Sequence, residues 1–261
     1  MKKLYLLLML IILVVPVFSQ RRYVPEKIYK QDPIICHRTN EKINIDGKCS
    51  EESWKSAKSY DFYSNSKHMH FKTEERTPYS KAFVKCMYDN ENIYVFFKGN
   101  DKDLTSYVKE TDGDTYKDDC FEVFFSPGPD CRWYYNTEIN IINTQYTGKN
   151  HKGGGSDETG NRWKNMWNPI IETGIFYEGT LNNPYDCDKY WCIELKIPFN
   201  IIDEMKNKEI KRGDKWTVNF AKFDYSIYIE ENLGGYDMCS TSLTDLESFH
   251  EYQNWRTLIF E

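Results

Sequence analysis

Residues 118–125 read DDCFEVFF, and this stretch constrains the fold more than any other in the chain. Strand side chains alternate between two faces, so three apolar side chains would take one face and Cys120, Glu122 and Phe124 the other. Glu122 is the only charge within the strand. Burying an unpaired carboxylate is costly, so Glu122 needs a hydrogen-bonding partner, a cation, or water in a ligand-binding concavity.

Further strand signals recur along the chain, with turn residues between them. They lie at residues 81–88, 92–99, 132–142, 169–177, 190–197, 215–224 and 255–260, and short helices are expected at 50–57 and 199–205. The turn cluster SPGPD at residues 126–130 would join two of the strands. Many strands and almost no helix predict an all-β fold, an antiparallel β-sandwich with one or two short helices.

The amino terminus has the pattern of a secretory signal peptide. Lys2 and Lys3 precede an apolar run over residues 4–18, which is shorter than the ~20 residues of a membrane-spanning helix. We expect a signal peptide at 1–19, an N-terminal extension at 20–41 and one sandwich domain at 42–261. The expected protein is therefore secreted, periplasmic or extracellular, without a transmembrane segment once the signal is removed. An uncleaved membrane anchor is the alternative.

Charge and cysteine content narrow the function classes. The formal net charge is -6 and the basic residues are scattered singly among acids, which argues against nucleic acid as a partner. All 8 cysteines follow the expected signal peptide, so disulfides can form. Cys187 and Cys192 make a plausible local pair, whereas Cys86 and Cys120 in predicted strands can be buried thiols. No cysteine spacing matches a zinc site.

A second strand carries an alternating polar face. In YYNTEINII, residues 134–142, the polar face consists of Tyr134, Asn136, Glu138 and Asn140. Neighbours on one face are about 7 Å apart, a spacing that suits the hydroxyls of one or two sugar rings. An ordinary solvated outer face is the alternative.

Two aromatic residues stand in polar surroundings, Tyr116 before the acidic pair and Phe249 in a late loop. The apolar face of a pyranose ring packs flat on such side chains, and polar groups then fix its hydroxyls. Ordinary packing is the alternative for each ring.

Four segments resemble the motifs of carbohydrate-binding module family nine, in the same order. They are INIDGKCSEESW at 43–54, YDNENIYVFFKGNDKDL at 88–104, TYKDDCFEVFFSP at 115–127 and SFHEYQNWRTLIF at 248–260. The resemblance implies a DOMON-like β-sandwich, of the immunoglobulin-like jelly-roll type, that clamps a sugar, often at a chain end, between two aromatic rings.

The resemblance also implies roles for single residues. Tyr116 and Phe249 fall on the two clamping positions, where the family has larger tryptophan rings. Glu122 falls on the motif glutamate that accepts sugar hydroxyls. Glu138 and Asn140 match positions on the following strand, although Glu138 stands where the family tends to have an arginine.

No cofactor is expected to be required, but the family can bind calcium. Asp101, Asp103, Asp112 and Asp114 are oxygen donors in loops that could hold this ion. Solvated turn acids are the alternative, because the four do not form an EF-hand pattern.

We therefore expect a secreted, non-catalytic carbohydrate-binding protein whose partners are oligosaccharides or polysaccharides. Such modules accompany glycoside hydrolases, so an association with polysaccharide breakdown is expected. A glycoside hydrolase that uses Glu122 and Glu138 stays open, since retaining enzymes hold two carboxylates about 5 Å apart. The strand register decides that distance.

A third hypothesis is a haem-binding DOMON-type cytochrome domain, because haem-binding relatives of this sandwich use an axial methionine and histidine. Met87 lies in a predicted strand, and His68, His70 and His250 are available. None of these residues lies in a recognisable haem motif.

Overall fold

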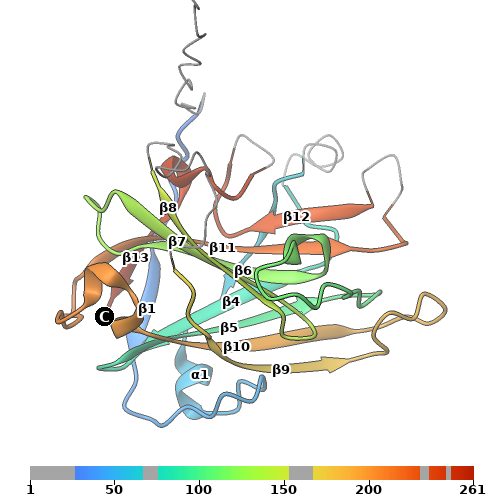
Figure 1. The fold of residues 1–261 in the computed structure, drawn as a ribbon, viewed down its shortest axis with the longest axis horizontal. Helices are drawn as coiled ribbons and strands as arrows, with labels where there is room; N and C mark the ends of the chain where they lie inside the picture. The colour runs from blue at the N-terminus through green and yellow to red at the C-terminus, as the bar shows by residue number, and fades with distance from the viewer. Residues whose placement is uncertain (1–26, 67–75, 153–166, 230–234, 245–247) are drawn as a thin grey trace, which may run out of the picture.

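The computed structural model describes residues 27–66, 76–152, 167–229, 235–244 and 248–261. Within these ranges a sheet of 13 strands curls into two packed layers (Figure 1). The expected signal peptide lies outside the described residues. None of the described helices combines the length and apolarity needed to cross a membrane.

The strands are β1 (Ile34–Arg38), β2 (Tyr60–Asp61), β3 (Tyr63–Ser64), β4 (Ala82–Tyr88), β5 (Asn92–Asn100), β6 (Cys120–Ser126), β7 (Trp133–Asn140), β8 (Gln145–His151), β9 (Glu172–Glu178), β10 (Tyr190–Pro198), β11 (Lys215–Tyr225), β12 (Tyr236–Ser240) and β13 (Arg256–Phe260). The helices are α1 (Glu52–Ser56) and the single 3-10 turns η1 (Thr115–Lys117), η2 (Phe199–Ile201), η3 (Asp203–Met205) and η5 (Tyr252–Asn254).

The strand order is β8-β7-β6-β11-β13-β1-β4-β5-β10-β9, and β12 pairs with β11. The pairs are antiparallel except at β1, which runs parallel to both β13 and β4 and so joins the two layers. The predicted all-β sandwich is confirmed. Part of the range 20–41, expected to be an extension, is β1 and belongs to the sheet.

Each of the eight expected strands is present with small shifts at its ends, whereas β1, β2, β3, β8 and β12 were not predicted. The sequence of β8, QYTGKNH, is polar and contains glycine, so it lacks a strand signal of its own. It forms by pairing with β7 along seven residues.

Aromatic rings fill the space between the layers. Phe121 of β6 stacks on Phe97 of β5, with ring centroids 4.7 Å apart, and meets Trp191 of β10 at 4.4 Å. The apolar face predicted for residues 118–125 therefore points into the core.

The outer side of β4, β5 and β10 is covered by α1 (Figure 1). Buried Glu194 of β10 accepts hydrogen bonds from Trp54 Nε1 at 2.8 Å and from the amides of Asp46 and Gly47 at 2.9 and 2.7 Å. Gly47 has φ +79°, and a Cβ there would lie 2.9 Å from Ile175 backbone. These contacts explain why Asp46, Gly47 and Trp54 occur at this spacing in INIDGKCSEESW: all three hydrogen-bond to Glu194.

The other layer has its own covered outer face. We use "outer face" for the side of β6, β7, β11 and β12 that points away from the core. Phe249 and Trp255, from the segment before β13, pack there on Phe124 of β6, with ring centroids 6.2 and 5.5 Å from it.

All eight cysteines are free thiols in the structure. The expected Cys187–Cys192 pair is not formed: Cys187 is exposed ahead of β10, and Cys192 is buried within it. Burial and the neighbouring Cys86 thiol raise the pKa of Cys36 well above its ordinary value.

Candidate binding site

Two glutamates meet on the outer face. Glu122 of β6 lies directly opposite Glu138 of β7 in the antiparallel register, and Cβ atoms of such pairs are about 5 Å apart. On its other side Glu122 faces the small side chain of Ala221 in β11. Glu122 is 2% exposed and Glu138 7%. The register thus brings together two carboxyl groups that the sequence had placed on separate strands.

The electrostatics of this acidic pair are unusual. Burial, followed by the charge of Glu138, raises the pKa of Glu122 well above its ordinary value. Burial raises the pKa of Glu138 to about 7. Neither carboxyl group forms an ion pair within the described part of the chain. At neutral pH the pair therefore offers both a protonated carboxyl group, which donates, and an ionised one, which accepts.

The two glutamates differ in their hydrogen bonds. Glu138 accepts one from Thr115 Oγ1 at 3.0 Å and one from Asn136 Nδ2 at 3.2 Å. Among the described residues Glu122 has one weak contact, from the Cys120 thiol at 3.8 Å. Most of the hydrogen-bonding capacity of a carboxyl group is left unused at Glu122.

Tyr116 and Phe249, the expected clamp, lie on the outer face beside a common neighbour. Their ring centroids are 6.2 and 5.2 Å from that of Phe223 in β11. Tyr116 is 41% exposed, whereas Phe249 is 3% exposed. Tyr116 also follows Thr115, which bonds Glu138. Tyr116 is thus an exposed ring one residue from a hydrogen-bond partner of Glu138, whereas Phe249 is buried against Phe124 and Phe223.

Asn140, expected to contact the sugar, has its side chain fully engaged within the protein. Its amide donates to Val108 O and Asp118 Oδ2, both at 2.8 Å, and its oxygen accepts from Thr144 N at 2.7 Å. Asp118 in turn accepts from the amides of Tyr107 and Val108. We therefore regard Asn140 as a positioning residue that fixes the loop before η1.

Asn136 and Thr115 were not among the expected site residues. Asn136 links Glu138 to Asn150, whose Nδ2 donates to Asn136 Oδ1 at 2.8 Å. Gly148 lies opposite Asn136, and a Cβ at Gly148 would come within 2.6 Å of that oxygen. Asn136 could have been found from its place on the polar face of β7. Nothing in the sequence marks Thr115.

The four aspartates expected to hold calcium do not converge. Asp103 accepts from Ile227 N at 2.9 Å, and Asp112 accepts from Thr147 N at 3.2 Å. Asp114 is exposed and paired with Lys117. Each of these three carboxyl groups therefore interacts with a different partner in a different part of the structure.

Asp101, the fourth, belongs to a buried group on the core side of the sheet with Asp119 and Asp224. Their nearest oxygens lie within 4.8 Å of one another. The ammonium group of buried Lys222 is 3.5 Å from Asp101 and 3.3 Å from Asp224, and it also donates to Asn100 O at 3.0 Å. A calcium ion does not fit here, because the lysine already supplies the positive charge.

The residues considered for haem are on opposite sides of the sandwich. Met87 packs in the cluster beneath α1, whereas His250 is half-buried against Tyr134 on the outer face, with its Nδ1 2.8 Å from the tyrosine oxygen. His68 and His70 lie outside the described residues. The structure therefore gives no support to a Met87–His250 haem site.

Known structures share this fold. A proposed carbohydrate-binding protein from Bacteroides uniformis aligns with a TM-score of 0.62 and 17% identity, over 88% of this chain and 99% of that one. A family 9 carbohydrate-binding module from Caldicellulosiruptor kristjanssonii in complex with glucose aligns at 0.53 and 15%, over 87% and 95%. The same organism's module with cellotriose aligns at 0.52 and 14%, over 87% and 93%.

No curated protein sequence matches the chain. A sequence profile does match: that of the carbohydrate family 9 binding domain-like family, over residues 45–226. This range includes α1, the acidic pair and Lys222. The chain thus belongs to the carbohydrate family 9 binding domain-like family.

Proposed function

We propose that the protein is an exported, non-catalytic carbohydrate-binding protein, and that it binds a sugar, at a chain end, against Tyr116 at the acidic pair. The observation that carries this proposal is Glu122. Glu122 is buried and has a single weak partner among the described residues, and the exposed Tyr116 ring follows the threonine that bonds the opposite Glu138. A sugar hydroxyl, which both donates and accepts, would supply the missing hydrogen bonds.

The arrangement provides the two parts of sugar recognition. The Tyr116 ring offers an apolar platform, and Glu122 and Glu138 offer directional hydrogen bonds. Thr115 and Asn136 hold Glu138 in place. The glucose and cellotriose complexes of the structural neighbours support a neutral glucan as the first ligand class to test. A single small platform favours affinities between micromolar and millimolar.

Binding without hydrolysis is proposed because the chain belongs to a family of carbohydrate-binding domains. A retaining glycosidase needs one ionised nucleophile beside one protonated acid about 5 Å away. The strand register puts Glu122 directly opposite Glu138, so a glycoside hydrolase is the second candidate function. Release of reducing sugar that disappears in Glu122→Gln would establish catalysis instead.

The proposal includes export and a role in polysaccharide breakdown alongside glycoside hydrolases. The amino-terminal sequence of residues 1–19 supports export, and family membership supports the association with glycans.

Binding is proposed to be independent of calcium, which the place of Lys222 among the aspartates supports. Affinity measured with and without a calcium chelator tests this point.

Calorimetric titration with glucose and cellotriose tests the site. Loss of the platform in Tyr116→Ala is expected to weaken binding about tenfold or more. Phe249→Ala should weaken it as well, by removing the packing behind Phe223. Tyr185→Ala, which removes another exposed tyrosine, is the matched control and should leave affinity unchanged. Unchanged affinity in both Tyr116→Ala and Phe249→Ala would place the site elsewhere.

A further inference from the structure

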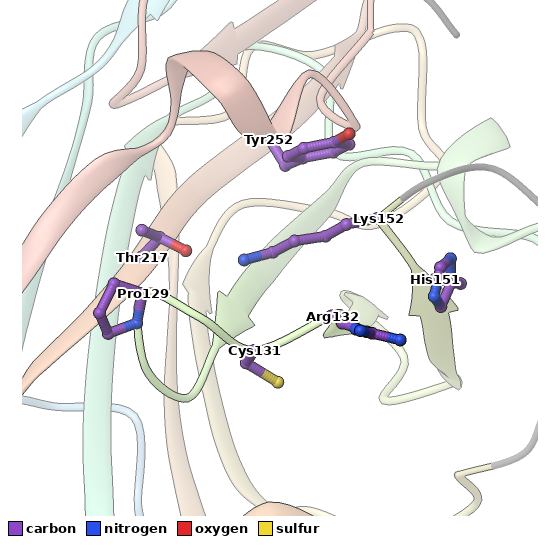
Figure 2. A pocket seen from close by; sticks show the side chains of 7 residues that line it. All are labelled: Pro129, Cys131, Arg132, His151, Lys152, Thr217 and Tyr252. Carbon is purple, nitrogen blue, oxygen red and sulfur yellow. The ribbon is translucent and has the colours of Figure 1, made fainter.

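A concave region lies on the outer face, at the end away from Tyr116. It is an open depression of about 560 Å³ between the β6–β7 loop, the end of β8, β11 and η5. Figure 2 shows the ring of Tyr252 above the Lys152 side chain, which extends toward Thr217 and Pro129. Glu138 and Trp133 are five residues apart on β7, so the depression begins about 17 Å from the acidic pair.

Two cations without counterions line this depression. Arg132 and Lys152 form no ion pair within the described part of the chain. Lys152 is about half buried, and burial lowers the pKa of its ammonium group. A partly desolvated ammonium group without an anion is unfavourable, so the site would gain from a bound anion.

Two hydroxyl groups at the wall also lack partners in the part of the chain that the structure describes. Thr217 Oγ1 and Tyr252 Oη are buried there without a hydrogen bond. Each hydroxyl has a hydrogen to donate, which an oxyanion bound at this wall would accept. Tyr252 stacks on Tyr134, with ring centroids 6.5 Å apart and planes 30° from parallel, so its ring is held as a fixed platform.

We propose that this depression is a second sugar subsite, which binds an acidic sugar through a carboxylate or sulfate group on Arg132 and Lys152, with the ring against Tyr252. The proposal rests on the proposed carbohydrate-binding function and extends it to charged glycans. Arg132 can bind a planar carboxylate through two parallel hydrogen bonds, whereas Lys152 acts as a point charge for either anion.

Calorimetry and NMR titration with glucose, glucuronate and glucose 6-sulfate test this subsite. We expect the two acidic sugars to bind more tightly than glucose here, and the Arg132→Ala/Lys152→Ala double variant to weaken them about tenfold. Their binding should also weaken at high salt. A larger loss for glucuronate than for glucose 6-sulfate in Arg132→Lys would identify the carboxylate as the preferred group.

Three controls separate this subsite from the first. Tyr116→Ala should affect glucose and spare the acidic-sugar site. Lys208→Ala/Lys211→Ala removes two exposed lysines elsewhere and should change nothing. Tyr252→Phe deletes only the unpaired hydroxyl, so it should reduce acidic-sugar affinity without reducing stability.

The outcomes distinguish the two proposals. If glucose binds at Tyr116 but acidic sugars bind no better and ignore the double variant, the second subsite is wrong and the proposed function stands. Binding of inorganic sulfate here with no acidic sugar also overturns it. If none of the sugars binds anywhere, the proposed function fails and the subsite fails with it.

Discussion

Carboxyl groups are buried on both faces of the same layer, and the two clusters are built differently. On the core side, Asp101, Asp119 and Asp224 surround the ammonium group of Lys222. On the outer face, Glu122 and Glu138 lie side by side with hydroxyl, amide and thiol partners and no cation among the described residues. Both clusters raise the pKa of their acids by burial.

The difference separates a structural cluster from a binding site. A cation inside the core cluster offsets part of the desolvation of its carboxylates, so this cluster contains its own compensating charge. The outer pair lacks that compensation and therefore reduces the stability of the free protein. Groups that cost stability in this way are typical of functional sites.

Removal of the core cation should have the largest effect. Lys222→Met leaves three buried carboxyl groups without their partner, and breaking a buried ion pair typically costs about 3–5 kcal/mol of the free energy of unfolding. Urea unfolding at pH 7 measures the loss. Acidification should recover part of it, because the carboxyl groups then bind protons.

Lys215→Met is the matched control, since Lys215 is an exposed lysine on the same strand. Its free energy of unfolding should stay close to that of the wild type. If Lys222→Met were destabilised by less than about 1 kcal/mol, the core lysine would not compensate the aspartates, and the contrast between the clusters would fail.

Neutralising one outer acid should stabilise the protein. The pKa of Glu138 is about 7 in the folded state against an ordinary value of 4.5. The folded state therefore binds more protons between these values, and its stability falls as the pH rises from about 4.5 to about 7. Glu138→Gln should remove this fall and be more stable than wild type at pH 8, by up to about 3 kcal/mol.

Chemical denaturation at pH 4 and pH 8 checks the sign. The variant and the wild type should be nearly equal at pH 4 and diverge at pH 8, while Glu209→Gln, at an exposed glutamate, should follow the wild type at both. Parallel curves for wild type and Glu138→Gln would mean that Glu138 is not a strained acid, and the outer pair would resemble the core cluster.

The sequence predicted one side of this comparison better than the other. The isolated charge of Glu122 in an apolar strand and the polar alternation of β7 were visible as local patterns. The ion pair between Lys222 and Asp101 was not visible in the sequence. Asp101 is 121 residues from Lys222, and the two side chains meet only through the packing of the two layers. Side-chain contacts that depend on loops were hidden for the same reason: Asn140 donates to Val108 O and Asp118 rather than standing free.

The smallest expected effect concerns the hydroxyl that supports the outer pair. Thr115 Oγ1 donates to Glu138 at 3.0 Å, and this bond favours the charged form of the acid. Thr115→Val should raise the pKa of Glu138 further and cost about 1 kcal/mol at pH 8, with a smaller loss at pH 4. Thr115→Ser keeps the hydroxyl and is the control. Carboxyl NMR titration and denaturation of both variants test this prediction. If Thr115→Val and Thr115→Ser have the same Glu138 pKa and the same stability, the Thr115 hydroxyl does not stabilise the ionised outer acid as the Lys222 ammonium group stabilises the core acids.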